Sequence, residues 1–253
     1  MSRLHLIPNT LDFGVVAGEP APLDELLPLV VIRTAAGLEH WVCENAKTTR
    51  AFLKRVDAVC VLSRPLQEIS IVELPRPPKG RDAGPDAMAV GELLAPARAG
   101  HDLGLISEAG LPALADPGAL LVAAAHAAGI PVVAHPGASS IALALAASGL
   151  NGQSFAFVGY IPVPGDVRAA RIRALEATSR REGQTQLLIE TPYRNTALLE
   201  ALLANLQPVT ALSVSVGLTL PGGYTHSASV AQWRQRATTL PADVPAVFAL
   251  LAR

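Results

Sequence analysis

The feature that most constrains the fold is an alternation of apolar strand-like runs, small-residue loops and alanine-rich runs between residues 103 and 150. Residues 103–106 and 131–134 are predicted strands, and each leads into a loop of Gly, Pro and other small residues. Predicted helices at residues 119–128 and 139–148 follow these loops. Small residues let main-chain groups approach a ligand closely. Two such loops, one strand–helix unit apart, therefore predict a small-molecule or cofactor site at the carboxyl edge of a sheet.

The rest of the chain continues this alternation, and the ratio of predicted strands to helices rises after Gly149. Apolar runs predict strands at residues 4–8, 41–43, 69–74, 154–158, 187–190, 211–216 and 246–251. Helices are predicted at residues 23–34, 46–56, 87–99, 167–178 and 195–205, and loops at residues 11–21, 75–85 and 220–223. The first half favours a largely parallel sheet, whereas the second half has more strands per helix. The prediction is an α/β protein of two α/β domains, 1–136 and 137–253, the second with a mixed sheet.

The composition fits a globular protein with balanced charge. Its 253 residues suffice for one large or two small domains, and half of them are apolar. The chain has 20 Lys and Arg and 21 Asp and Glu, a balance that does not indicate a nucleic-acid-binding protein. This overall balance is compatible with a local basic patch. No stretch has the roughly 20 uninterrupted apolar residues of a membrane span, and the first residues lack the apolar core of a signal peptide. A cytoplasmic protein that does not bind a membrane is expected.

Several familiar site motifs are missing from the sequence. The six histidines show no HxxxH or HExxH spacing, so no metal site is expected. The chain has no Walker loop, no GxGxxG after its first strand and no Gly-x-Ser-x-Gly. A P-loop, a nicotinamide Rossmann site and a nucleophile elbow are therefore not expected. Cys43 and Cys60 form no CxxC pair, which favours buried thiols in a reducing compartment over the alternative of a disulfide.

Polar residues in the loops between residues 103 and 150 are candidates for binding a ligand. Glu108 can accept hydrogen bonds from ligand hydroxyl or amine groups, or it can cap a helix. Asp116 and Pro117 read as a helix start, with Asp116 as the N-cap. Ser139 or Ser140 is expected to cap the next helix, whose amino terminus favours an anion or a carboxylate.

Two more polar clusters follow predicted strands. Residues 190–194 place a Glu, a Tyr and an Arg within five positions, and residues 44–50 lead from a Glu into a basic helix. For both clusters the alternative is helix capping combined with a solvated helix face.

Four segments, in order, resemble the tetrapyrrole methylase superfamily. They are residues 44–56 (ENAKTTRAFLKRV), 107–118 (SEAGLPALADPG), 136–150 (PGASSIALALAASGL) and 190–194 (ETPYR). The likeness is greatest to the branch that methylates ribose 2′-oxygens of small-subunit ribosomal RNA. Two differences from that branch are a first-strand loop without an early glycine (IPNTLDFGVV) and a Glu, Glu108, in place of Asp.

The resemblance implies two α/β domains that bind S-adenosylmethionine in the cleft between them, and a homodimer. By motif it assigns cofactor contacts to loops at strand ends. These residues are Pro8; Ser107, Glu108, Ala109 and Gly110; Ser139 and Ser140; Thr191, Pro192 and Tyr193; and Gly217, Leu218 and Thr219.

Methyl transfer from a sulfonium is a direct displacement, so such an enzyme gains mainly by aligning the acceptor and excluding water. A hydroxyl acceptor also needs a general base, and Glu44, Lys47 and Glu190 are the candidates, among which the sequence does not choose. Arg50 and Arg194 are expected to hold a phosphate or carboxylate of the acceptor. RNA is the leading acceptor and a small molecule such as a tetrapyrrole is the next. The alternative of another class is a cofactor-binding or scaffold protein without turnover.

Overall fold

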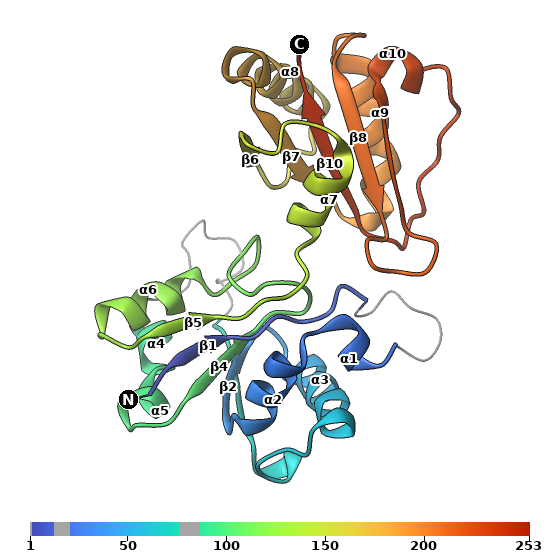
Figure 1. Ribbon diagram of the computed structural model, residues 1–253. Helices are drawn as coiled ribbons and strands as arrows, with labels where there is room; N and C mark the ends of the chain where they lie inside the picture. The colour runs from blue at the N-terminus through green and yellow to red at the C-terminus, as the bar shows by residue number, and fades with distance from the viewer. Residues whose placement is uncertain (1, 13–20, 76–86) are drawn as a thin grey trace. The chain divides into compact units, whose positions relative to one another are not determined.

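The computed structural model describes residues 2–12, 21–75 and 87–253. The chain divides into two compact units, Met1–Ala138 (unit 1) and Ser139–Arg253 (unit 2), which Figure 1 shows in cool and warm colours respectively. The sequence-based boundary between residues 136 and 137 lies two residues earlier. No helix of the described residues has the length and apolar character needed to cross a bilayer.

Unit 1 contains a parallel sheet with the strand order β3-β2-β4-β1-β5. Every neighbouring pair in it is parallel, as the alternation of strands and helices predicted. Its register aligns Cys43 with Ile106 and Leu6 with Leu105, so the carboxyl ends of neighbouring strands share one edge. The strands are β1 (Leu4–Leu6), β2 (His40–Cys43), β3 (Ser70–Glu73), β4 (Leu103–Ile106) and β5 (Val132–Ala134).

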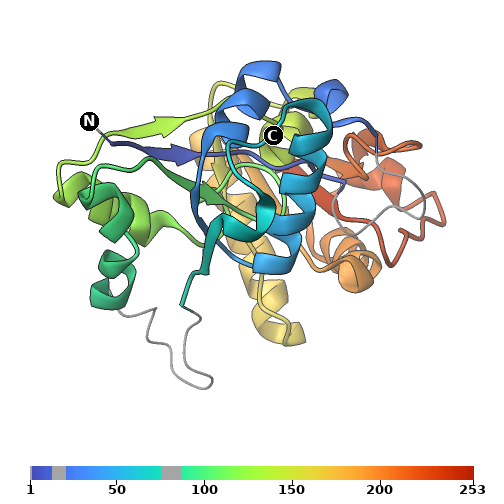
Figure 2. The same cartoon turned by 90° about the horizontal axis from the view of Figure 1, so that it is seen from below.

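Helices cover both faces of this sheet (Figure 2). Alternate residues of one strand face opposite layers. Trp41 and Cys43 accordingly pack into one apolar cluster, whereas Val42 packs into the other. On the first face lie α1 (Leu23–Leu26), α2 (Leu29–Gly37) and α3 (Ala46–Val59), with a 3₁₀ turn η1 at Leu66–Glu68. On the second face lie α4 (Ala87–Glu92), α5 (Ala95–Arg98) and α6 (Ala119–Ala127).

Unit 2 contains a mixed sheet with the order β6-β7-β10-β8-β9, as predicted. The β6–β7 pair is parallel, and the other pairs are antiparallel. Its strands are β6 (Phe155–Phe157), β7 (Thr185–Ile189), β8 (Ala211–Val216), β9 (Tyr224–Ser229) and β10 (Ala246–Leu251). Helix α7 (Ser140–Ser148) packs on one face. The other face carries α8 (Gly165–Glu182), α9 (Asn195–Asn205) and α10 (Val230–Trp233), and a 3₁₀ turn η2 (Pro192–Arg194) follows β7.

Prolines divide two helices that the sequence predicted as continuous. The helix expected at residues 23–34 breaks because Leu27, which precedes Pro28, is extended, with φ −124° and ψ 142°. The helix expected at residues 87–99 ends at Glu92 and restarts at Ala95. Pro96 has no N–H for the carbonyl four residues earlier, so the ladder cannot pass through this point.

Asp116 is not the N-cap of α6, since the helix begins at Ala119 and Gly118 occupies the cap position. Strand β9 was not predicted, because its sequence YTHSAS has few apolar residues. Most of the loops expected at residues 11–21 and 75–85 lie outside the described residues.

Candidate functional site

The carboxyl edge of the sheet in unit 1 is where its chain connections diverge. Strand β1 leads through α1 and α2 on one face to β2, whereas β4 leads through α6 on the other face to β5. Because β1 and β4 are neighbours, their following loops separate at this edge. Crevices at such switch points are the usual ligand sites of open parallel sheets. Pro8 and residues 107–110, to which the family resemblance assigned cofactor contacts, lie in these two loops.

Asn9 ties the two loops together. Its Nδ2 group donates hydrogen bonds to the carbonyl oxygens of Ser107 at 3.1 Å and Glu108 at 3.0 Å. Its main-chain N–H donates to the carbonyl of Gly110 at 2.8 Å. Asn9 is 1% exposed, so these bonds are made away from solvent. Asn9 was not among the predicted site residues. The signal for it in the sequence was a polar residue directly after Pro8, in the loop that lacks the early glycine.

The loop after β4 leaves one polar group free. Ser107 is buried, and its Oγ atom has no hydrogen-bond partner within the described residues. Ala109 is half-buried, Gly110 is buried and the Glu108 side chain is exposed. Close by, Gly137 passes so near Pro8 that a Cβ atom on it would overlap the proline ring. This edge is therefore built from small residues in close main-chain contact, with one buried hydroxyl available.

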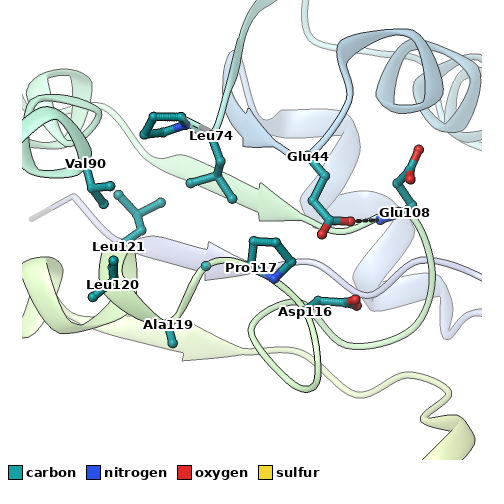
Figure 3. Close-up of a pocket in the computed structure, with 11 residues that line it drawn as sticks. Glu44, Leu74, Val90, Glu108, Asp116, Pro117, Ala119, Leu120 and Leu121 are labelled. Carbon is teal, nitrogen blue, oxygen red and sulfur yellow. Dashed lines mark hydrogen bonds between the residues drawn. The ribbon is translucent and has the colours of Figure 1, made fainter. Parts of the chain in front are cut away.

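A pocket of about 610 Å³ opens beside this edge, and we call it the carboxylate pocket. Its walls combine apolar side chains, such as Leu74, Val90 and Leu121, with three carboxylates (Figure 3). The carboxylates are Glu44 after β2, Glu108 after β4, and Asp116 in the loop before α6. Glu44 Oε2 accepts a hydrogen bond of 2.8 Å from the main-chain N–H of Glu108, which joins two of these loops.

The carboxylates disfavour one another's charge. Burial raises the pKa of Glu44; the hydrogen bond from the Glu108 N–H opposes this shift, and the negative charge of Glu108 adds to it. Burial also raises the pKa of Asp116, to about 7, with further contributions from the negative charges of Glu44 and Glu108. At neutral pH the pocket thus holds a carboxyl group that exchanges its proton readily, the property expected of acid–base groups in active sites.

A second pocket, of about 330 Å³, has apolar walls and one titratable residue, His135. His135 Nε2 lies 3.0 Å from Nδ1 of the buried His5. On its other side, His5 Nε2 lies 3.5 Å from a carboxylate oxygen of Asp102. Burial lowers the pKa of His135, and the charge of His5 lowers it further. His5 and His135 are 130 positions apart in the sequence, so the pair was not predicted.

Lys47 and Arg50, the expected base candidate and phosphate ligand of unit 1, lie exposed in the first turns of α3. Asn45 is the N-cap of this helix, and its side chain accepts a hydrogen bond of 3.0 Å from the Lys47 N–H. The Arg50 guanidinium makes one long contact, 3.4 Å to the carbonyl of Ala46. These cations therefore begin an exposed basic helix face that starts two residues after Glu44.

Glu190, at the end of β7 in unit 2, is buried and bound by cations. Its Oε1 accepts hydrogen bonds from the Thr191 N–H at 2.8 Å and from Arg194 Nε at 3.1 Å. Its Oε2 lies 3.8 Å from Arg168 Nη2. Arg194 binds one carboxylate oxygen, and Arg168 lies near the other, which has no hydrogen-bond partner among the described residues. This geometry supports a structural role for Glu190 and Arg194. Tyr193 is 70% exposed, and its ring lies 5.2 Å from the Arg194 guanidinium carbon.

The other expected residues of unit 2 lie in two loops and at one helix start. Register places Ile189 of β7 opposite Val247 and Val216 of β8 opposite Ala246, so residues 191–193 and 217–219 follow strands that end at the same sheet edge. Thr219 has φ 69° and is exposed. Ser139 is the N-cap of α7 and accepts a hydrogen bond of 3.4 Å from the Ala142 N–H, whereas Ser140 is the first residue of the helix.

Within the residues that the structure describes, no group of three or more His, Cys, Asp or Glu is arranged to hold a metal ion. Cys43 is buried, Cys60 is half-buried and both are free thiols.

Comparison with known proteins shows that the chain matches a protein family. Residues 25–231 match the family described as Tetrapyrrole (Corrin/Porphyrin) Methylases. Two solved structures resemble the whole chain. They are the methyltransferase CobJ, with a TM-score of 0.56, 14% identity and full coverage of both chains, and the uroporphyrin-III-C-methyltransferase of Thermus thermophilus, with a TM-score of 0.50, 20% identity and coverage of 99% and 92%. At these identities the likeness concerns the fold, an α/β arrangement with two sheets.

Curated relatives share more sequence over shorter spans. Proteins named ribosomal RNA small subunit methyltransferase I are 40% identical over 113 residues in Micromonospora olivasterospora and 32% identical over 168 residues in Mesorhizobium japonicum. These alignments cover 45% and 66% of this chain, and 35% and 50% of the relatives. The chain thus spans half or less of the length of these relatives.

Proposed function

The chain belongs to the tetrapyrrole methylase family, and from this premise we propose that it is an S-adenosylmethionine-dependent methyltransferase acting on small-subunit ribosomal RNA. The observation that carries the proposal is the family match over residues 25–231. The choice of RNA is supported by the names of the relatives that are 32% to 40% identical. A ribose hydroxyl is the proposed acceptor group.

The edge of unit 1 suits the methyl donor. S-adenosylmethionine presents ribose hydroxyls, an adenine edge and an amino-acid group, all of which pair well with main-chain atoms. The buried, unpartnered Ser107 hydroxyl and the small residues around it offer such atoms without side-chain obstruction. The proposed donor contacts in unit 1 are Pro8, Ser107, Glu108, Ala109 and Gly110. In unit 2 they are Ser139, Ser140, Thr191, Pro192, Tyr193, Gly217, Leu218 and Thr219.

When bound, S-adenosylmethionine supplies an electrophilic methyl group. The chain's own residues then have to orient the acceptor, keep water away and remove its proton. The apolar walls of the carboxylate pocket, including Leu74 and Leu121, serve to exclude water. Glu44 positions the loop after β4 through its hydrogen bond to the Glu108 N–H. Arg50, on the exposed face of α3, is the proposed contact for an RNA phosphate.

The assembly and location follow from the same proposal. The protein acts as a homodimer in the cytoplasm, where ribosomal RNA is made and modified. Light scattering coupled to size-exclusion chromatography is expected to give twice the chain mass of 26.3 kDa. A mass of one chain at micromolar concentration would contradict the dimer.

The function is tested in two stages with the intact protein. Calorimetry is expected to show saturable binding of S-adenosylmethionine. The protein is then incubated with S-adenosylmethionine labelled in the methyl group and with small subunits, or their RNA, from cells that lack this protein. Label is expected in a ribose of the RNA. Label in a tetrapyrrole or another small molecule instead would reassign the acceptor, and binding without transfer to any extract would indicate a scaffold protein.

A further inference from the structure

We propose that Asp116 is the catalytic residue that removes the proton from the acceptor hydroxyl. This inference rests on the proposed methyltransferase function and names a residue that neither the sequence motifs nor the family assignment gave a chemical role. The carboxylate pocket is the proposed place of the acceptor, and Asp116 lines it together with Glu44 (Figure 3).

The backbone of residues 113–118 holds Asp116 in place. Ala115 directly before it has φ 65°, a left-handed conformation that costs energy for a residue with a Cβ atom. Gly118, with φ 128°, packs so closely that an added Cβ would lie 2.9 Å from Leu105 Cδ2. The turn is thus anchored against β4 and positions the Asp116 carboxylate at the pocket instead of at the start of α6. Strained backbone of this kind is concentrated at functional sites.

The other carboxylates are less suited to accept a proton. Glu44 Oε2 already accepts the N–H of Glu108, and Figure 3 shows the Glu108 side chain directed away from the carboxylates of Glu44 and Asp116. Glu190 lies in unit 2, where it forms ion pairs with Arg168 and Arg194. Asp116 accepts no hydrogen bond and forms no ion pair with any residue that the structure describes. Its lone pairs are therefore available to a substrate hydroxyl.

The charges around Asp116 tune it for this role. The groups that act on it are Glu44 from the end of β2 and Glu108 from the end of β4, and both are negative. Together with burial they raise the pKa of Asp116 to about 7. A carboxylate with such a pKa is a stronger base than an ordinary aspartate and still has a substantial ionised fraction at neutral pH.

The step balances as an O-methylation. The acceptor oxygen forms a bond to the methyl carbon while the carbon–sulfur bond breaks, and the sulfur keeps that electron pair. The hydroxyl proton moves to a carboxylate oxygen of Asp116 and leaves to water after the product departs. Because the pocket is negative, it suits an uncharged sugar or base and repels phosphate. The phosphates of the acceptor are thus expected outside the pocket, toward the cations of α3.

The test compares Asp116→Asn with Asp24→Asn, a matched loss of one carboxylate at an exposed position of α1. Methyl transfer to small-subunit RNA is measured from pH 5.5 to 9 at saturating S-adenosylmethionine. We expect kcat of the wild type to rise with pH and to level off above about 7. Asp116→Asn is expected to lower kcat by about 10²- to 10⁴-fold and to remove this rise. Its affinity for S-adenosylmethionine, measured by calorimetry, is expected to stay within about twofold, and Asp116→Glu is expected to restore part of the rate.

A second readout needs no activity. An Asp whose pKa is raised from 3.8 to about 7 on folding binds a proton that the unfolded chain releases between these pH values. Wild-type stability from this group is therefore present at low pH and is lost as pH rises toward 7. The Tm of Asp116→Asn relative to the wild type is expected to increase over this range and then stay constant. Asp24→Asn is measured over the same range as the matched control.

The outcomes separate this inference from the proposed function. A wild-type protein that transfers methyl groups, with Asp116→Asn equally fast, would overturn the role of Asp116 alone. A pH-independent Tm difference for Asp116→Asn would also count against it. A wild type that binds S-adenosylmethionine but methylates nothing would overturn the proposed function, and the role of Asp116 with it.

Discussion

At the residue scale, the geometry of the donor loop depends on Asn9. Its amide donates to two carbonyls of the loop after β4, and its Oδ1 accepts the main-chain N–H of Thr10 at 2.9 Å. No other residue type of similar size supplies two donors and an acceptor in this arrangement. Asn9 thus holds the loops after β1 and β4 in close contact with one side chain.

We expect Asn9→Ala to lower the free energy of unfolding by about 1–3 kcal/mol, because it leaves buried carbonyls without donors. Asn9→Asp is expected to cost more, since it places a carboxylate against two carbonyl oxygens. Urea unfolding of both variants measures the difference. An aspartate variant as stable as the wild type would show that these hydrogen bonds do not hold the loop.

Glu190 provides a second prediction at this scale. Glu190→Gln leaves Arg168 and Arg194 without their shared counter-charge, and breaking a buried ion pair on one side costs about 3–5 kcal/mol. Glu182→Gln is the control, because its partner Arg181 and Glu182 itself are both exposed. Thermal unfolding is expected to show a large drop in Tm only for the first variant. Equal shifts in the two variants would show that the ion pairs of Glu190 do not stabilise the fold.

At the scale of elements, side chains as well as main-chain bonds join β1 to β5. His5 in β1 contacts His135, which directly follows β5, and Asp102 before β4 approaches from the other side. Protonating both rings would place two donors against each other across 3.0 Å. The pair therefore couples the edge of the unit 1 sheet to pH.

Because burial lowers the pKa of His135 on folding, the neutral form is favoured in the folded protein. Its contribution to stability is present above the ordinary value of 6.5 and is lost as pH falls below it. We expect the difference in Tm between His135→Gln and the wild type to shift in favour of the variant as pH falls from 7.5 to 5.5, because the variant lacks the destabilising group. His126→Gln, at an exposed position of α6, is the matched control and is measured over the same pH range.

Helices and strands with a regular spacing of apolar residues and clear boundary residues were predicted most accurately. Helix α9 and strands β8 and β10 begin and end at the predicted residues. The errors occurred where one residue overrides a period, as Pro28 and Pro96 do in the divided helices. Asp116 is the most instructive error. Aspartate before Pro-Gly is typical of a helix start, but packing of Gly118 against Leu105 moves the start to Ala119.

At the scale of the whole molecule, the net charge is −1, but the charged side chains are unevenly distributed. The exposed side of α3 carries Lys47, Arg50 and Lys54, spaced so that they share one helix face. This helix begins next to Glu44 and thus next to the carboxylate pocket. Under the proposed function, phosphates of the RNA contact this face while an uncharged sugar enters the pocket.

We expect the double variant Arg50→Gln/Lys54→Gln to bind small-subunit RNA more weakly. The slope of log K against log salt concentration is negative, and its magnitude is expected to decrease by about 1.5 in this variant. Each lost phosphate contact accounts for roughly 0.7–0.9 of that magnitude. Arg98→Gln/Arg171→Gln removes the same charge from exposed positions on α5 and α8 and is expected to leave the slope unchanged. Filter binding at several salt concentrations gives both slopes. Equal slopes for the two double variants would remove α3 from the RNA contact.

The sequence by itself determined the α/β class, the parallel first sheet, the mixed second sheet and the family, because these depend on local periodicity and on motifs that can be read in order. It also found most residues of the strand-end loops. Only the tertiary structure decided that Asn9 joins the loops after β1 and β4, that Glu190 is held by two arginines, and that Asp116 shares a pocket with Glu44 and Glu108. These relations depend on distances between residues far apart in the chain, and the charge and burial that shift a pKa arise from such distances.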